Sequence, residues 1–310
     1  MRFYSNQAMR VWKYLPDPVR RTSVGYAFGR HLHRLVCQNA DRKQYVATFF
    51  LRNRPELELM RSLADAKPNG STLKITVLAC SKGAEVYSAL WTIRQARPDL
   101  NVITQAIDIS DEILAFAERG VYFRGALDAG TAKDQNAAPS AEYVTRNTHL
   151  DQGAPIFERM TPEELEAICD IEGDEARIKP WLREGITWRN GDAGDPKLVD
   201  VLGPQDIVVA NRFLCHMKPA DAEKCLRNIA RMVRPGGFIF VSGIDLDVRT
   251  KVAQSLNWKP VTKLMREIHN GDSSIRMGWP LEYWGLEPYH SGNSDHGIRY
   301  ASVFQVEQAS

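Results

Sequence analysis

Short apolar runs and helical periodicities alternate along the middle of the chain. The mostly apolar run at 73–79 predicts a buried strand, and apolar positions at helical spacing over 84–97 predict a helix directly after it. A second strand is expected over 102–107, ending on Asp108. The following helix has an N-capping and a C-capping signal, Ser110 and Gly120.

The same alternation returns further along the chain. Residues 206–210 and 238–242 predict short apolar strands, with a helix over 219–233 and a turn at 234–237 between them. Strands that alternate with helices lie parallel, and strands this apolar are buried on both faces. We therefore expect an α/β fold of Rossmann-like type, with a doubly wound, mostly parallel sheet and ligands at the carboxyl ends of its strands.

Three zones flank or interrupt this alternation. Residues 1–70 predict a basic, helical N-terminal extension, and residues 71–310 the α/β domain. Within that domain 121–190 is less regular, and we interpret it as an insertion or long crossover that returns as a strand at 186–189. Near the end of the chain, 299–306 alternates as a strand does and predicts a closing antiparallel strand.

Composition is that of an ordinary globular protein, with 44% hydrophobic and 25% charged residues. No apolar run approaches the roughly 20 residues needed to cross a bilayer, and no secretory signal is visible. The five cysteines are scattered without a CxxC pair, which predicts reduced, mostly buried thiols rather than a disulfide framework or a zinc site. We expect a cytoplasmic protein without a bound metal.

Basic residues are concentrated at the N-terminus, although the whole chain carries a net charge of only +2. Residues 1–45, the N-terminal arm, hold nine Lys or Arg against two Asp and carry a net charge of +7. Such an arm suits an acidic protein partner or an anionic surface, and a solvated face of an amphipathic helix is the simpler alternative. It lacks the aromatic interleaving of a single-strand nucleic-acid groove, so we expect no nucleic-acid partner.

Gly83 and Asp108 stand where a sheet of this type binds a nucleoside. A small-residue turn after the first strand lets the backbone approach a ligand, and an acidic residue ending the second strand accepts hydrogen bonds from both ribose hydroxyls. Asp108 could instead cap the following helix through Ser110. The turn lacks the GxGxxG pattern that cradles a pyrophosphate, so a nucleoside without phosphates fits better.

Residues 79–88, ACSKGAEVYS, resemble the GCSTGEEPYS motif of the CheR family, the chemotaxis-receptor glutamate methyltransferases. Further segments agree in order: 48–52 is similar to the family's TxFFR, 118–122 to its AxxGxY and 210–217 to its CRNVLIYF. Residues 226–237 correspond to its LrPGG helix end and turn. The resemblance covers roughly residues 46 to 245 and implies a class I methyltransferase that uses S-adenosylmethionine (SAM) and releases S-adenosylhomocysteine.

The resemblance also implies which residues bind the cofactor. Thr48 and Arg52 would reach the methionine carboxylate, Asp108 the ribose and residues 192–193 the adenine, while residues 211–212 would border the reacting end. Arginine can clamp a carboxylate bidentately. The full implied set, in chain order, is Thr48, Arg52, Ala79, Ser81, Gly83, Glu85, Asp108, Ile109, Asp192, Ala193, Asn211 and Arg212.

Several positions depart from the family's pattern. Its first Gly is Ala79 here, its first Glu is Ala84, and its Arg-Asn pair is reversed at 211–212. Val46 stands where the family has an Asn, and His216 replaces a Tyr close to the transferred methyl.

The change at His216 concerns the acceptor. A carboxylate acceptor needs no base, whereas a hydroxyl or ammonium does, and a histidine can remove that proton. We therefore predict that His216 and Arg212 are catalytic and that the acceptor is an oxygen or nitrogen, most simply on a small molecule. The alternative is that His216 is a packed residue hydrogen-bonded to backbone.

Aromatic residues near the C-terminus are candidates for the acceptor pocket. The expected substrate contacts are Tyr87, His216, Trp279, Tyr283 and Trp284. The aromatic segment could equally cap the core without touching a ligand. In the CheR family a basic helix meets the acidic methylation region of the receptor, so the N-terminal arm is a candidate for a similar use.

Other functions stay open at this point. The chain could methylate glutamates on a protein partner, or bind the cofactor as a regulator without turnover, as Ala79 and Ala84 in the motif suggest. It could also use the sulfonium for cyclisation or for transfer of the aminocarboxypropyl group, because pocket geometry decides which carbon is attacked.

Overall fold

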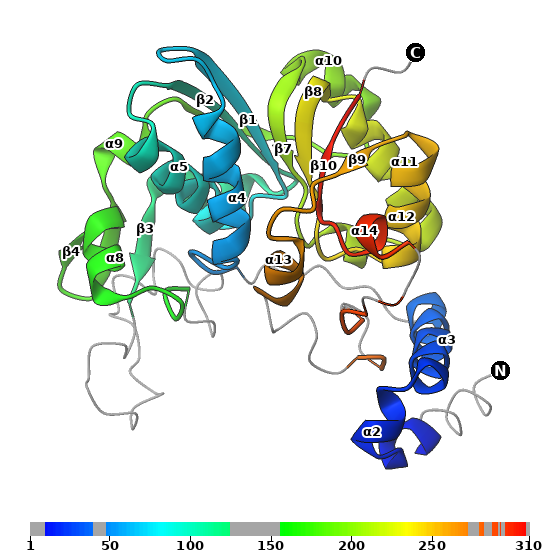
Figure 1. Cartoon of the computed structure of the whole chain (residues 1–310). Coiled ribbons are helices and arrows are strands. Elements are labelled where there is room, and N and C mark those ends of the chain that lie inside the picture. Colours follow the sequence, from blue (N-terminus) through cyan, green and yellow to red (C-terminus); the bar gives the residue numbers. More distant parts are fainter. Residues whose placement is uncertain are drawn as a thin grey trace.

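A seven-stranded sheet forms the centre of the computed structural model, which describes residues 10–39, 48–124, 156–271, 279–281, 287–290, 292 and 295–307 (Figure 1). The strand order is β6-β2-β1-β7-β8-β10-β9. The first five strands in this order run parallel, and β10 is antiparallel to both β8 and β9. The strands are β1 (Thr72–Leu78), β2 (Asn101–Asp108), β6 (Ile186–Asn190), β7 (Gln205–Val209), β8 (Val233–Phe240), β9 (Lys259–Pro260) and β10 (Val303–Gln305).

Helices cover both faces of this sheet. The described helices are α2 (Asp17–Arg20), α3 (Ser23–Asn39), α4 (Arg54–Asp65), α5 (Ala84–Ala96), α6 (Asp111–Arg119), α8 (Pro162–Ile168), α9 (Pro180–Arg183), α10 (Pro196–Leu202), α11 (Pro219–Ala230), α12 (Leu246–Ser255), α13 (Met265–Gly271) and α14 (His296–Arg299). A second, three-stranded sheet has the order β3-β5-β4, from β3 (Val121–Phe123), β5 (Glu175–Ile178) and β4 (Cys169–Glu172).

Strand β7 shows why the sheet needs helices on two sides. Ile207 and Val209 belong to the core under α4, α5 and α6, whereas Val208 and Ala210 belong to the core under α10, α11 and α12. Side chains along a strand alternate between faces, so a strand that is apolar throughout must be covered on both. This confirms the expected doubly wound, mostly parallel sheet.

Most expected elements form within a residue or two of their predicted bounds. Ser110 caps α6 by accepting a hydrogen bond from the Ile113 backbone N–H, and Gly120 ends that helix with φ of 60°. The segment 234–237 differs, because it is a bulge inside β8 rather than a turn before it. The last strand, β10, is also shorter than the expected range 299–306, because Arg299 still belongs to α14.

The interruption between β3 and β6 has its own local order. Residues 125–155 lie outside the described ranges. Thr161 then caps α8 with a capping box, in which its side chain accepts a hydrogen bond from the Glu164 backbone N–H and the Glu164 side chain accepts one from the Thr161 backbone N–H. Strands β4 and β5 then pair with β3 in the smaller sheet, and β6 returns to the main sheet beside β2, where a strand is expected.

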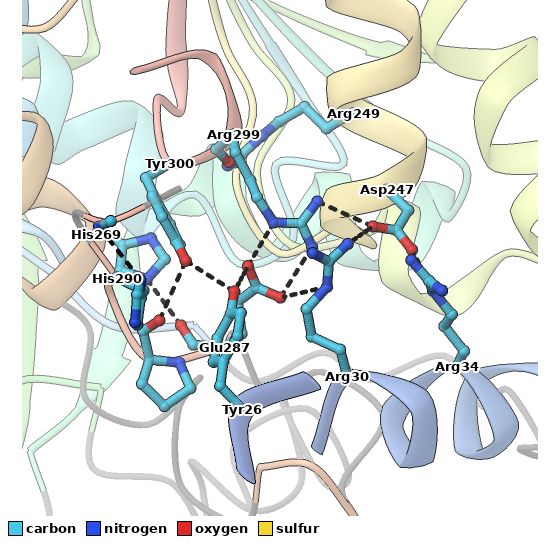
Figure 2. Close-up of polar contacts among 12 residues, drawn as sticks. Tyr26, Arg30, Arg34, Asp247, Arg249, His269, Glu287, His290, Arg299 and Tyr300 are labelled. Carbon is cyan, nitrogen blue, oxygen red and sulfur yellow. Dashed lines mark hydrogen bonds and ion pairs between the residues drawn. The ribbon is translucent and has the colours of Figure 1, made fainter. Parts of the chain in front are cut away.

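The N-terminal helix α3 is held by charged and aromatic contacts to the C-terminal half (Figure 2). Arg30 donates to Asp247 Oδ1 at 3.0 Å, and Arg34 donates to Asp247 Oδ2 at 2.7 Å. Tyr26 donates its hydroxyl to Glu287, which also accepts a bidentate pair of hydrogen bonds from the buried Arg299. Part of the basic charge of the N-terminal arm is therefore used within the chain.

Trp279 also packs against α3. Its ring packs edge-on against Trp12 and stacks on Tyr26. A Cβ atom at Gly29 would lie 2.3 Å from the Trp279 ring, so this position in α3 has no room for a side chain. Small size here allows helix and indole to approach closely.

The structure describes the side chains of four cysteines. Cys80, Cys169, Cys215 and Cys225 are buried, and none of these four forms a disulfide. No helix among the described residues is both long and apolar enough to span a bilayer. Nor do three or more His, Cys, Asp or Glu side chains of these ranges gather as a metal site.

Candidate active site

The turn after β1 carries an unusual backbone. Ala79, Ser81 and Gly83 all have positive φ, at 50°, 49° and 84°. Gly83 adopts this conformation freely, whereas Ala79 and Ser81 do so at a cost of about 1–2 kcal/mol each. The turn folds the chain back tightly, and hydrogen bonds from Cys80 N–H to Ile107 and from Gly83 N–H to Cys80 hold it.

Asp108 joins this turn to the end of β2. Its Oδ2 accepts a hydrogen bond from the Ser81 backbone N–H at 2.9 Å, and its Oδ1 accepts one from the Ser110 backbone N–H at 3.1 Å. A carboxylate has about four lone-pair sites, so each oxygen can accept a further hydrogen bond. Asp108 therefore orders both loops and still offers acceptors to hydroxyl groups of a ligand.

Asn211, at the end of β7, organises the opposite side of the site. Its Oδ1 accepts hydrogen bonds from the Ser242 backbone N–H at 2.9 Å and the Ser242 hydroxyl at 2.8 Å. This orients its Nδ2 toward two carboxyl groups, Glu56 Oε1 at 2.7 Å and Glu85 Oε1 at 2.8 Å. Glu56 comes from the first turn of α4 and Glu85 from the first turn of α5.

Burial shifts the pKa values of these groups. It raises the pKa of Glu56 to about 8, with the Glu85 charge adding to the effect, and it also raises the pKa of Glu85. Burial lowers the pKa of Arg52, and it lowers that of Arg212 to about 9, to which the charge of Arg52 contributes. Carboxyl and guanidinium groups thus share a site where each charge depends on its neighbours.

Arg212 sits on a strained backbone. Its φ is 61°, and its backbone N–H donates to Ser242 O at 2.9 Å. A Cβ atom at Gly243 would lie 2.7 Å from the Arg212 Cα atom, so the loops after β7 and β8 meet only because position 243 is glycine. Such strain at a cavity wall is often maintained for function.

One cavity, of about 310 Å³, collects nearly all of the predicted cofactor-binding residues at the carboxyl ends of β1, β2, β6 and β7. Its lining residues are Thr48, Arg52, Ala79, Cys80, Ser81, Glu85, Ile107, Asp108, Ile109, Ser110, Ile113, Gly191, Asp192, Ala193, Asn211, Arg212, Phe213, His216 and Met217. It lies at the topological switch point, where strand order reverses between β1 and β7. Residues far apart in sequence therefore line one cavity.

The remaining predicted residues lie elsewhere. Gly83 does not line the cavity, and a Cβ atom there would lie 3.1 Å from the rings of Tyr87 and Trp188 and from Ala117. Tyr87 is fully buried in the core, where its hydroxyl donates to Ala117 O at 2.7 Å. Trp279 packs on α3, away from the cavity lining. Tyr283 and Trp284 lie outside the described residues.

Glu56 is a residue of the site that was not predicted from the sequence. It lines a small chamber of about 30 Å³ that shares four wall residues with the larger cavity: Arg52, Glu85, Asn211 and Arg212. The detectable signal is that Glu56 precedes buried Leu59 and Met60 by three and four residues, so it lies on the apolar stripe of α4. Phe213 and Met217, which flank the predicted His216, also went unnoticed.

The chemistry of the cavity fits SAM. Asp108 lies among apolar Ile107, Ile109 and Ile113, which suits hydroxyls beside a nucleoside. Toward Asn211 the wall instead offers guanidinium and carboxyl groups, which suit the two charges of an amino acid. When bound there, SAM supplies an electrophilic methyl carbon on a sulfonium.

Comparison with known proteins agrees with this geometry. Residues 47–149 match the family model for the CheR methyltransferase SAM binding domain, and residues 127–241 match a methyltransferase domain model. No curated protein matches the chain.

Solved structures with similar folds are distant. An O-methyltransferase family protein from Burkholderia thailandensis is 13% identical, with 92% of this chain and 59% of that one covered and a TM-score of 0.37. A SAM-bound amino pentose methyltransferase from Micromonospora echinaspora, involved in calicheamicin biosynthesis, is 11% identical, with 61% and 48% covered and a TM-score of 0.31. The chain thus spans between about half and three fifths of the length of these structures.

The strand order, with parallel β6, β2, β1, β7 and β8 followed by antiparallel β10, is typical of class I methyltransferases. The two matches show methyltransferase domain sequences within residues 47–241, the first of them that of a CheR SAM binding domain.

Proposed function

We propose that the protein transfers the methyl group of SAM to an oxygen or nitrogen atom of a small-molecule acceptor, with His216 as general base. The observation that carries this proposal is the position of His216. It ends the short 3-10 helix Leu214–His216 after β7 and lines the same cavity as Asp108, Glu85 and Arg212. A histidine beside the cofactor can serve an acceptor that must lose a proton.

The division of labour among the residues follows from their chemistry. Asp108 holds the ribose, and Arg52 with Glu85 orients the amino-acid end. Arg212 borders the reacting end and helps to align the acceptor, since alignment supplies much of the acceleration in a displacement at a methyl carbon. His216 accepts the proton of an acceptor O–H or N–H as the new bond to the methyl forms, and the leaving group is the neutral thioether.

Apolar Phe213 and Met217 on either side of His216 support a small organic acceptor, because such pockets are mostly apolar with few polar groups. The N-terminal arm offers less support for a protein acceptor, since Arg30 and Arg34 already pair with Asp247 inside the chain. Methylation of a protein glutamate remains the alternative that the following experiment also tests.

The test is to incubate the protein with SAM and a cell extract and to identify the cofactor product by mass spectrometry. S-adenosylhomocysteine is expected, with a methylated small molecule in the low-molecular-weight fraction. Methylthioadenosine would instead indicate cyclisation or aminocarboxypropyl transfer, and tight binding without turnover would indicate a regulator. Methylated products found only in the protein fraction would contradict the proposal of a small-molecule acceptor.

A further inference from the structure

The carboxyl groups of Glu56 and Glu85 meet at a single nitrogen atom. Each accepts one hydrogen bond from Asn211 Nδ2, at 2.7 and 2.8 Å. The orientation of the amide is fixed, because Asn211 Oδ1 accepts hydrogen bonds from both the backbone N–H and the hydroxyl of Ser242. Glu56 is only 6% exposed, and its Oε2 is buried without a hydrogen-bond partner among the described residues. Two full negative charges this close, one of them buried and the other partly buried, would repel one another strongly.

A proton on Glu56 resolves this conflict. A buried carboxylate with an unsatisfied oxygen is costly, whereas a neutral carboxylic acid costs much less. Burial and the Glu85 charge together raise the pKa of Glu56 far above that of an ordinary glutamate, which favours the acid form of Glu56. Glu85 is the better site for the negative charge, because the Arg52 charge is the strongest influence that lowers its pKa, whereas the pKa of Glu56 is also raised by the Glu85 charge.

Positive charge faces the pair from several elements. Arg52 precedes α4 and Arg212 follows β7, and both line the chamber beside Glu56 and Glu85. Arg249 on α12 also acts on this region, since Glu56 raises its pKa against the effect of burial. A cationic ligand entering here meets guanidinium groups, and two carboxylates offset more of that repulsion than one does.

We propose that Glu56 and Glu85 act as one proton-holding pair that responds to positive charge in the cofactor cavity: the free protein holds a proton on the pair, and binding of a cationic cofactor releases it. The step is an ionisation, in which the Glu56 carboxylic acid becomes a carboxylate and its proton passes to the solvent. The sulfonium of SAM adds a positive charge that S-adenosylhomocysteine lacks, so the pair distinguishes cofactor from product. This inference rests on the proposed cofactor site.

Calorimetry measures this linkage without an acceptor. SAM is titrated at pH 7 into the full chain in buffers of different ionisation enthalpy, which gives the number of protons released. We expect a release approaching one proton with SAM, distinctly less with S-adenosylhomocysteine, and almost none from SAM with Glu56→Gln. Glu58→Gln is the matched control, because Glu58 lies on the same helix but is exposed and paired with Arg61.

The pH dependence of affinity gives a second readout. If a proton leaves on binding, SAM affinity rises with pH by up to about tenfold per unit and levels off above about pH 8, where Glu56 of the free protein becomes mostly ionised. The Glu56→Gln variant lacks this rise. Protons that SAM itself exchanges are the same in the titrations of the two proteins, so they cancel in the comparison.

A third measurement needs no variant and therefore survives a folding defect of Glu56→Gln. The infrared band of a protonated carboxylic acid should be present in the wild-type protein and disappear when SAM is added. Equal proton release from wild type and Glu56→Gln, or a band that stays, would overturn the proposal. Failure of SAM to bind at all would instead overturn the proposed function.

Discussion

Asp108 accepts a hydrogen bond from the backbone N–H of Ser81 at 2.9 Å, across the gap between two neighbouring strand ends. The contact ties the turn after β1 to the end of β2. It explains how one carboxylate can both shape the loop and present oxygens to a ligand.

Replacing Asp108 with Asn should therefore weaken SAM binding. The amide keeps one acceptor oxygen but turns an NH2 toward a backbone N–H or a ribose hydroxyl. Loss of a hydrogen bond to a charged group is worth about 1.5–3 kcal/mol, so we expect a roughly 10- to 100-fold rise in Kd. Calorimetry measures it, with Asp111→Asn on the exposed first turn of α6 as control. An unchanged Kd would remove Asp108 from the ribose site.

His216→Gln should slow methyl transfer without weakening cofactor binding. A general base contributes about 10²–10⁴-fold in rate, so a loss in this range is expected, together with loss of the acidic limb of the pH profile. The rate of S-adenosylhomocysteine formation with the identified acceptor gives this value. His31→Gln, on the exposed face of α3, is the control. A variant with wild-type rate and pH profile would show that His216 is a packing residue.

Ala79→Gly should stabilise the protein slightly. Ala79 has φ of 50°, and glycine relieves a strain of about 1–2 kcal/mol while adding an entropy cost of about 0.5–1 kcal/mol in the unfolded chain. We expect a net gain of about 0.5 kcal/mol in the free energy of unfolding. Ala66→Gly, where φ is −75°, should lose stability in the same denaturant titration. Equal losses in both variants would mean that Ala79 carries no strain.

Acid should loosen the attachment of α3 through Asp247. Burial would raise the pKa of Asp247, but the hydrogen bond from Arg34 and the charge of Arg299 lower it to about 2. A carboxyl whose pKa is lower in the folded state stabilises the fold above about pH 4, and this contribution disappears as the pH falls toward 2. Melting temperatures of wild type should therefore fall more steeply than those of Asp247→Asn between pH 4 and pH 2.

The control for this titration is Asp200→Asn, because Asp200 is exposed on α10. It should follow the wild-type curve. At pH 7 the Asp247→Asn protein should already melt lower than wild type, since both Arg30 and Arg34 lose a charged partner. Parallel curves for wild type and Asp247→Asn would exclude the ion pairs from the acid response.

Local signals account for the part of the fold that could be predicted. Ser110 and Gly120 bound α6 through hydrogen bonds and dihedral angles that involve their immediate neighbours, so sequence spacing is enough to find them. The bulge at 234–237 could not be found in this way, because it depends on how β8 aligns with β7. A Gly-Gly pair after proline reads as a turn until its partner strand is known.

The candidate site divides along the same line. The order of the motifs indicated residues that line the larger cavity. The hydrogen bond between Glu56 and Asn211, by contrast, joins positions 155 residues apart, and its only local signal in the sequence is a glutamate on the apolar stripe of a helix. Tyr87 shows the opposite case. It lies within the recognised motif, yet the helical spacing of α5 turns it into the core with Val86 and Leu90.

The contacts of Tyr26, Arg30 and Arg34 with Glu287 and Asp247 fasten the beginning of the chain to its end. Helix α3 and the segments that carry Asp247 and Glu287 therefore supply ion-pair and hydrogen-bond partners to each other. A chain cut off before residue 48 would leave Asp247 and Glu287 short of cationic and hydroxyl partners. Deletion of α2 and α3 should therefore destabilise the protein more than deletion of terminal helices without such contacts would.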